Sequence, residues 1–318
     1  MVKIAVAAPG QVAREITEVL VATGKHEVIT LARRDLVPEE IVEGTTPLKV
    51  DFHNKDDLAK ALRGVHTVLS FVVAQNDPEA TAQKTLIDAS IAAGVKRFAP
   101  SEWFVARFTH LKWNDSKLLA RDYLEEVNKN GKVLEYCLFQ PGLFTDYHAN
   151  ENINKHLKTN DFLPIDFANR RLLAPGSLEP RFTATTIQDV GNIVAKAIEY
   201  EGEWPKIGGI AGETLSLAQE LAIGEKIRGK KFDVELLDLD SLRRGEWNGS
   251  WVKPLDHPSV QHLDEETRAA FSRAAFSGFL LALAEGDMVV SDEWNRIFPD
   301  YKFTGVEEFV SNFWVGRP

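Results

Sequence analysis

Cysteine is almost absent from this sequence: Cys137 is the only one in 318 residues, so no intramolecular disulfide can form. No apolar run reaches the roughly twenty residues that a helix needs to cross a bilayer. The eight histidines are scattered without metal-ligand spacing, so we expect no metal site. These absences exclude a disulfide scaffold and a membrane-spanning class. We therefore expect a protein of the reducing cytoplasm without a membrane partner.

Negatively charged residues outnumber positively charged ones in this sequence. The chain has 37 Lys and Arg residues against 47 Asp and Glu residues, which gives a formal net charge of −10. This balance argues against a nucleic-acid partner, although a local basic groove for a phosphate is compatible with it. A chain of this length with 44% hydrophobic residues can bury a large core. Cys137 lies inside the apolar run 133–139, which favours a buried strand residue over a reactive thiol.

The first 34 residues predict a strand, a tight turn, a helix and a second strand. Residues 4–8 form an apolar run, Pro9-Gly10-Gln11 supplies the turn, and residues 26–32 form a β-rich run. Apolar residues recur between them at helical spacing, at Val12, Ile16, Val19 and Leu20. The helix of such a βαβ unit presents free backbone N–H groups and the positive end of its dipole at its N-terminus. An anionic cofactor is therefore the expected ligand.

The glycine fingerprint of dinucleotide sites is incomplete in this chain. Its three positions fall on Ala7, Gly10 and Ala13, so only the middle glycine is present. Alanine suits the third position, which packs a helix against a strand, better than the first, which makes the tight turn. On this pattern alone, a βαβ corner without a ligand stays an alternative.

The second predicted strand ends in Arg33 and Arg34, where NAD-binding proteins usually carry a carboxylate for the ribose hydroxyls. Two guanidinium groups without an acid suit a 2′-phosphate, which arginine binds through paired charge-assisted hydrogen bonds. The sequence therefore favours NADP(H) over NAD(H). The alternative is a solvated basic pair at the end of a strand.

Strand-like and helix-like segments alternate through the first 145 residues, which predicts an α/β protein with a doubly wound parallel sheet, the NAD(P)-binding Rossmann fold. Strands are expected at 3–7, 26–32, 48–50, 67–73, 97–99 and 133–139, and helices at 12–23, 56–62, 80–93 and 115–128. Loops and short pieces over a cleft are expected after residue 142, through residue 181. We expect a cofactor-binding domain over 1–150, rejoined by about 183–212, and a smaller, mainly substrate-binding C-terminal lobe over 151–318. The late aromatic residues, Trp294 among them, are expected in the core of that lobe.

Three segments carry a resemblance to a known family. They are residues 95–103, which read Val-Lys-Arg-Phe-Ala-Pro-Ser-Glu-Trp, Lys117 in the helix that follows, and residues 140–144, which read Gln-Pro-Gly-Leu-Phe. In these segments the chain resembles the atypical short-chain reductases of the NmrA-like, isoflavone reductase-like family, and its fungal members most closely. The resemblance continues through 185–191 and 215–220, so it covers most of the chain in matching order.

The resemblance implies that Lys117 is the central catalytic or cofactor-orienting residue. Asp115 is expected to cap the helix, so Lys117 lies in the first turn, where its charge opposes the helix dipole. A lowered pKa would let it relay a proton, whereas an exposed surface lysine is the alternative. Ordinary short-chain dehydrogenases carry a tyrosine four residues before the lysine, and that position is Trp113 here. The proton could then come from Lys117 itself, from His110 or from Tyr147.

The resemblance also implies the contacts of the cofactor. These are Gly10, Gln11 and Val12 on the pyrophosphate, Arg33 and Arg34 on the 2′-phosphate, Phe71 beside the adenine or ribose, Lys117 at the nicotinamide ribose, and Pro141 to Phe144 around the nicotinamide. The implied function is an NADPH-dependent reductase of a carbonyl or conjugated double bond in a small aromatic or polyketide-like natural product. The alternative is a non-catalytic NADP(H)-sensing regulatory protein, and the retained Lys117 favours the enzyme. We expect a small-molecule substrate and a monomer or homodimer.

Overall fold

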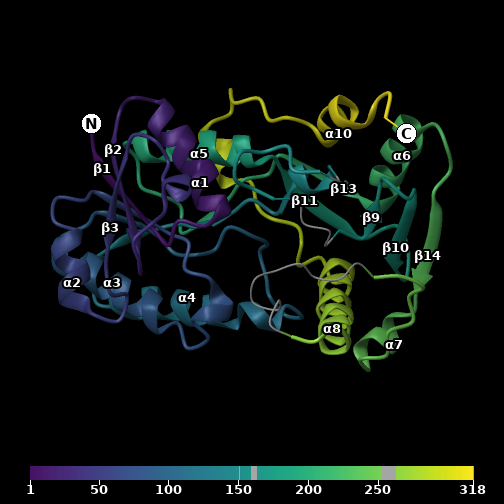
Figure 1. The fold of residues 1–318 in the computed structure, drawn as a ribbon, viewed down its shortest axis with the longest axis horizontal. Coiled ribbons are helices and arrows are strands. Elements are labelled where there is room, and N and C mark those ends of the chain that lie inside the picture. Colours follow the sequence, from purple (N-terminus) through teal and green to yellow (C-terminus); the bar gives the residue numbers. More distant parts are fainter. Residues whose placement is uncertain (150, 159–162, 253–262, 318) are drawn as a thin grey trace.

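The computed structural model describes residues 1–149, 151–158, 163–252 and 263–317. The molecule is elongated, with a six-stranded sheet and its helices at one end and smaller sheets at the other (Figure 1). The two chain termini lie at opposite ends of this view.

The six-stranded sheet is parallel throughout, with the strand order β3-β2-β1-β4-β5-β6. Its strands are β1 (Lys3–Ala7), β2 (Glu27–Ala32), β3 (Thr45–Lys49), β4 (Thr67–Ser70), β5 (Arg97–Ala99) and β6 (Glu135–Tyr136). The winding direction reverses between β1 and β4, and at such a point doubly wound sheets open a crevice at the carboxyl ends of their strands. The predicted doubly wound parallel sheet is confirmed.

Helices cover both faces of this sheet (Figure 1). On one face lie α1 (Gln11–Ala22) and α5 (Ile187–Glu199), and on the other lie α2 (Lys55–Ala61), α3 (Thr81–Ala93) and α4 (Asp115–Asn128). Successive side chains of β1 point to opposite faces, so Ile4 and Val6 pack with α1 and α5, while Ala5 packs with the other three helices. All three side chains are fully buried, as expected for the central strand of a covered parallel sheet.

Smaller sheets build the rest of the described chain. Strand β7 (Leu138–Gln140) pairs with β12 (Ile207–Gly209), β8 (Leu143–Phe144) and β13 (Glu213–Ser216) flank β11 (Arg181–Thr185), and β9 (Ile165–Asp166) and β14 (Asp233–Leu237) flank β10 (Arg171–Pro175). The later helices are α6 (Leu217–Arg228), α7 (Leu239–Arg243), α8 (Glu265–Ala284), α9 (Glu293–Ile297) and α10 (Val306–Trp314). Short 3₁₀ turns are η1 (Pro38–Glu40), η2 (Ala74–Asn76), η3 (Lys112–Asn114) and η4 (Thr145–His148). Within the described ranges, no helix combines the length and the apolar character needed to traverse a bilayer.

The bounds expected from the sequence hold for β1, β5 and α4, whose ends are as predicted. The single strand expected at 133–139 is wrong, because the chain pairs with β5 as β6 and then leaves that sheet to pair with β12 as β7. The strand expected at 67–73 ends at Ser70. The short pieces expected among the loops up to residue 181 are the short strands β9 and β10. The division into domains at 150 stays a prediction, and residue 150 lies outside the described residues.

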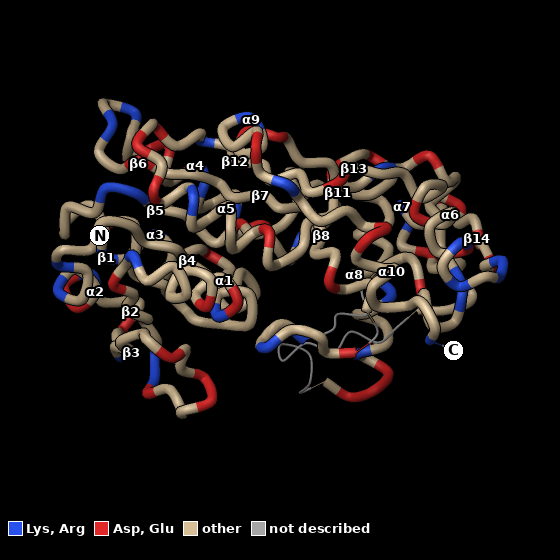
Figure 2. Tube along the Cα trace, turned by 90° about the horizontal axis from the view of Figure 1, so that it is seen from above, with Lys and Arg blue, Asp and Glu red and all other residues tan. Residues whose placement is uncertain are grey.

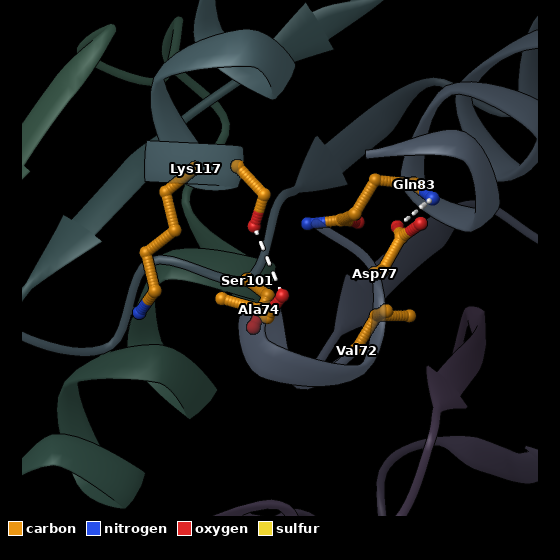
Figure 3. Close-up of a pocket in the computed structure, with 7 residues that line it drawn as sticks. Val72, Ala74, Asp77, Gln83, Ser101 and Lys117 are labelled. Atoms are coloured by element: carbon orange, nitrogen blue, oxygen red, sulfur yellow. Dashed lines mark hydrogen bonds between the residues drawn. The ribbon is translucent and has the colours of Figure 1, made fainter. Parts of the chain in front are cut away.

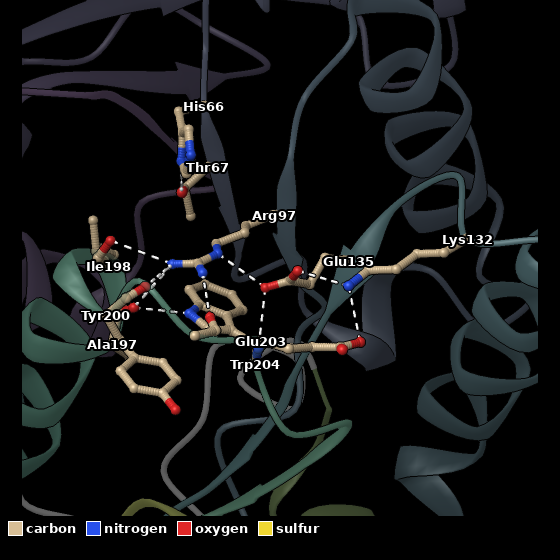
Figure 4. A network of polar contacts seen from close by, with 11 residues as sticks. His66, Thr67, Arg97, Lys132, Glu135, Ala197, Ile198, Tyr200, Glu203 and Trp204 are labelled. Carbon is tan, nitrogen blue, oxygen red and sulfur yellow. Dashed lines mark hydrogen bonds and ion pairs between the residues drawn. The ribbon is translucent and has the colours of Figure 1, made fainter. Parts of the chain in front are cut away.

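Arg97 joins β5 to the C-terminal end of α5 (Figure 4). Its buried guanidinium group donates hydrogen bonds to the carbonyl oxygens of Tyr200 at 2.8 Å and Gly202 at 2.7 Å. Its Nε donates to the Glu135 carboxylate of β6 at 3.0 Å, and its cation lies over the ring of Trp204. Because the last carbonyl groups of a helix have no partner within the helix, this arginine satisfies groups that would otherwise be buried without one.

We expect Arg97→Met to destabilise the fold by about 3–5 kcal/mol, because it leaves a carboxylate and several carbonyl groups without their buried partner. The measurement is urea unfolding followed by circular dichroism. Lys132→Met is the matched control: Lys132 pairs with the same Glu135 carboxylate at 2.8 Å but is half exposed, so its loss should cost about 1 kcal/mol or less. Equal losses in the two variants would contradict the anchoring role of Arg97.

Candidate functional site

The turn after β1 leads into α1 without a side-chain cap. Gly10 is the N-cap residue, and the Arg14 N–H donates the first helical hydrogen bond to the Gly10 carbonyl at 3.0 Å. The N–H groups of Gln11 and Val12 therefore have no acceptor within the helix. Ala8 has a left-handed φ of 59°, which is costly for a residue that carries a Cβ. The tight turn is thus made through an alanine, and it leaves backbone donors at the carboxyl edge of the sheet.

Residues 155–158 lie against the first turns of α1. Glu15 accepts hydrogen bonds from two successive backbone N–H groups of this segment, that of Leu157 at 2.8 Å. The side-chain oxygen of Gln11 accepts from the Lys158 N–H at 3.0 Å. This segment therefore borders the glycine turn, and its contact with Gln11 leaves the backbone N–H of Gln11 without an acceptor in the helix.

Arg33 and Arg34 follow β2 as expected, but they differ in their partners. Arg34 makes two hydrogen bonds to the Glu40 carboxylate, at 2.6 and 2.7 Å, and it lowers the pKa of Glu40 to about 2. Arg33 is exposed and makes no hydrogen bond or ion pair with any other described residue. The connection between β2 and β3 carries charges of both signs side by side (Figure 2). In this connection, the guanidinium group of Arg33 is the one that can bind an anion.

Arg14 reaches the same connection from the first turn of α1. Its Nη1 donates to the Glu39 carbonyl at 3.2 Å, while its Nε is buried without a partner in the described part of the chain. Buried nitrogen atoms without an acceptor are uncommon in proteins, so this one suggests a missing ligand. The sequence analysis did not single out Arg14, although its place one turn after Gly10 could have indicated it.

Phe71 directly follows β4 and is part of a stack of aromatic rings. Its ring stacks on Trp103 with centroids 4.5 Å apart, and Trp103 stacks on Phe139 at 5.4 Å. The stack continues through Trp294 at 5.5 Å to Phe298 at 5.6 Å. Trp294 therefore belongs to the core beside the main sheet, and its expected place in the smaller lobe is wrong, because α9 returns to pack on β7 and β12.

Lys117 lies in the first turn of α4 and is partly buried. The expected cap is wrong, since Asn114 is the N-cap residue and Asp115 is the first residue of the helix. The Lys117 Nζ donates a hydrogen bond to the Glu102 carbonyl at 2.6 Å and lies 5.5 Å from the centre of the Phe108 ring. Burial lowers the pKa of Lys117 to about 8, so this amine can exchange a proton near neutral pH.

A cavity of about 10 Å³, the size of one water molecule, lies beside Lys117 (Figure 3). Lys117 and Ser116 line it from α4, Ser101 lines it from the turn after β5, and Asp77 and Gln83 line it from the side of α3. Ser101 is buried and stands in the segment 95–103 that carries the family resemblance. That segment was the signal by which Ser101 could have been found, whereas Asp77 and Gln83 reach the cavity only through the fold.

The two other candidate proton donors have partners of their own. The Nε2 atom of His110 contacts the Glu285 carboxylate just beyond α8 at 2.8 Å. Tyr147 lies in η4, where its ring packs edge-to-face on Phe144 with centroids 5.6 Å apart. Their proposed roles stay predictions.

The segment from Pro141 to Phe144 is buried and joins β7 to β8. Gly142 has a φ of 75°, and a Cβ at this position would lie 2.2 Å from the Thr183 carbonyl oxygen, so only glycine fits. The Pro141 carbonyl accepts a hydrogen bond from the Thr185 hydroxyl at 2.7 Å. The residues expected to contact the nicotinamide therefore lie in a segment that β11 holds in place. Their roles stay predictions.

Metal and thiol chemistry find no support in the described ranges. Across them, no group of three or more His, Cys, Asp or Glu side chains could hold a metal ion. Cys137 is fully buried between β6 and β7, and burial raises the pKa of its thiol well above the ordinary value. The expected burial of Cys137 is confirmed, whereas its expected place inside a strand is wrong, because the chain changes from one sheet to another at this residue.

Known proteins resemble this chain along its whole length. A model of the NmrA-like family matches residues 2–310. The oxidoreductase BOA1 of Botryotinia fuckeliana is 27% identical over 95% of this chain and 97% of its own. An NADPH-dependent quinone oxidoreductase of Escherichia coli has a TM-score of 0.69 at 17% identity, over 97% of this chain and 98% of its own. An isoflavone reductase has a TM-score of 0.68 at 18% identity, over 98% and 99%.

We expect Ala8→Gly to raise the free energy of unfolding by about 0.5–1 kcal/mol, because relief of the left-handed strain exceeds the entropy that a glycine loses on folding. Ala7→Gly is the matched control one residue earlier. Ala7 ends β1 and is fully buried, so this change should lower the free energy of unfolding by about 1 kcal/mol. Urea unfolding compares the two, and the reverse order of stabilities would argue against strain at Ala8.

Proposed function

Because this chain belongs to the NmrA-like family, we propose that it is an NADPH-dependent reductase. The proposed reaction adds hydride to a carbonyl carbon or a conjugated double bond of a small aromatic or polyketide-like molecule. The observation that carries the proposal is Lys117, whose pKa is lowered to about 8 at the carboxyl edge of a doubly wound parallel sheet. A curated relative named as an oxidoreductase and fold neighbours named as reductases support the reaction class.

The residues at the edge of the sheet fit NADP(H). The free N–H groups of Gln11 and Val12 at the start of α1 suit a pyrophosphate. Arg33 is the guanidinium group for the 2′-phosphate, and the Nε of Arg14, which is buried without a partner among the described residues, offers a second donor from α1. Arg34 keeps its carboxylate partner and supports the shape of the connection. We had expected both arginines of the pair to bind the 2′-phosphate, and we now assign that contact to Arg33.

Lys117 is the residue that we assign to proton transfer. When bound, the reduced nicotinamide supplies the hydride. Reduction of a carbonyl also places a proton on the oxygen, and the Lys117 ammonium can both stabilise the developing negative charge and donate that proton. A donor with a pKa of about 8 is mostly charged at neutral pH and still gives up its proton readily.

The aromatic rings around Lys117 favour a flat, apolar substrate. Phe108 lies under the Lys117 ammonium and stacks on Phe104 with centroids 6.4 Å apart. Phe104, on the far side of Phe108, is only partly buried, so it offers apolar surface beside this ring pair.

The proposed setting is the reducing cytoplasm. The one cysteine is buried and forms no disulfide, and the net charge of −10 does not suit a nucleic-acid partner. A monomer or a homodimer can carry the reaction, because every residue assigned here belongs to one chain.

We expect the purified protein to bind NADPH more tightly than NADH, with a change in NADPH fluorescence and a rise in melting temperature. Arg33→Ala should weaken NADPH binding at least tenfold, because it removes a charge-assisted contact worth about 1.5–3 kcal/mol, while NADH binding stays nearly level. Arg34→Ala is the matched variant and should lose less, since Arg34 already binds Glu40.

Two outcomes would contradict this assignment. No binding at millimolar NADPH would refute the proposed function at its first step. Equal losses for NADPH and NADH in Arg33→Ala would mean that Arg33 attracts phosphates in general and that the preference for NADP(H) is unsupported.

We expect Lys117→Met to fold normally and to lower kcat by about 100-fold or more, with a small change in NADPH affinity, because it removes the donor but keeps the volume of the stem. In the wild type, kcat for reduction should fall as the pH rises through about 8, since the ammonium then loses its proton. The Lys117→Met variant should lack this fall of kcat near pH 8. Near-normal turnover in the variant would move the donor to His110 or Tyr147, and NADPH binding without turnover on a broad carbonyl and enone panel would favour the regulatory alternative.

A further inference from the structure

Two charged residues lie next to Lys117, and the sequence analysis assigned no role to either of them. Glu102 lies in the turn after β5, and Arg121 lies one helical turn after Lys117 in α4. We propose that Glu102 and Arg121 are positioning residues that hold the Lys117 ammonium in its working orientation. This inference rests on the proposed function and adds to it the groups that prepare its proton donor.

The first part of the support is the conformation of the turn. Trp103 has a φ of 41°, a left-handed value that is strained for a residue with a bulky side chain. Its backbone N–H donates to the Phe139 carbonyl at 3.0 Å, and its Nε1 donates to the Ser70 carbonyl at 2.7 Å. Two strands and the aromatic stack therefore hold this strained turn. In this conformation the Glu102 carbonyl accepts the hydrogen bond of Lys117 at 2.6 Å.

The second part is a buried ion pair behind that carbonyl. The Arg121 guanidinium donates two hydrogen bonds to the Glu102 carboxylate, at 2.9 and 2.6 Å, and the Glu102 side chain is 1% exposed. Such a two-point contact fixes the orientation of both groups. Arg121 also lies over the Phe108 ring at 5.0 Å, the same ring that Lys117 faces at 5.5 Å. Glu102 thus ties both cations of α4 to the turn, Lys117 through its carbonyl and Arg121 through its carboxylate, and both cations face the Phe108 ring.

The charges of this pair act on Lys117 in opposite directions. Burial is the main cause of its lowered pKa, the Glu102 carboxylate favours the ammonium form, and the Arg121 cation disfavours it. Asp77 also lines the cavity, but both its oxygen atoms accept backbone N–H groups at the start of α3, at 3.1 Å. Removing either member of the pair should therefore move the titration of Lys117, and the two removals should move it in opposite directions.

The test is the rate at which acetic anhydride acetylates Lys117 as a function of pH in the unliganded protein, read by mass spectrometry. Exposed Lys112, a few residues earlier, serves as the internal reference. We expect Arg121→Met to raise the midpoint of Lys117 by about one pH unit and Glu102→Gln to lower it by about one. The double variant Glu102→Gln with Arg121→Met should lie between them. Because it leaves no buried charge unpaired, its stability shows whether an unpaired charge is what unfolds a single variant, and in that case Arg121→Lys carries the test.

Arg121→Lys separates orientation from charge. It keeps the cation but loses the two-point contact, so the Lys117 midpoint should stay within a few tenths of a pH unit while kcat falls about tenfold or more at an unchanged KM. Unmoved midpoints in folded Met and Gln variants would overturn the proposal. Midpoints that move as expected in a protein that reduces no substrate would support the positioning and refute only the reductase function.

Discussion

The arrangement of this molecule depends on the hydrogen bonds of the buried Arg97 guanidinium group. Its side chain extends from β5 to the C-terminal end of α5, where it donates hydrogen bonds to the last carbonyl groups at 2.8–3.5 Å and to the Gly202 carbonyl just beyond at 2.7 Å. Helix α5 in turn packs on α1, the helix whose first turn presents free N–H groups. The same strand β5 continues into the turn that receives Lys117. One arginine therefore ties α5, and through it the packing of α1, to the strand that leads into the turn contacted by Lys117.

Backbone strain collects at the carboxyl edge of the main sheet. Ala8 follows β1 and Trp103 follows β5, and both have a positive φ that a side chain disfavours. Each is held by a hydrogen bond to a strand, from the Ala8 N–H to the Leu31 carbonyl of β2 at 2.9 Å and from the Trp103 N–H to the Phe139 carbonyl of β7 at 3.0 Å. These contacts offset the local cost of the strained turns, and in the second turn the Glu102 carbonyl accepts the hydrogen bond of Lys117.

The sequence predicted those parts of the fold that local pattern determines. The apolar run of β1 and the periodic helix α4 have the expected ends. The split of 133–139 into β6 and β7 was not predictable, because it depends on β12, which comes some seventy residues later in the chain. In the site, the position of Lys117 was predictable from the family resemblance. The capture of Arg34 by Glu40 depends on the folding of η1, which no local pattern indicates.

The stack of five rings from Phe71 to Phe298 has a consequence for how the chain can be divided. Its last two members come from the end of the sequence, yet they fill the core beneath the first strands. A fragment cut after the parallel sheet would lose Phe139, the ring on which Trp103 stacks, and one cut after β7 would expose the face of Phe139 that Trp294 covers. The core beside the parallel sheet is therefore completed only by Trp294 and Phe298, so a piece that folds by itself has to extend well beyond that sheet.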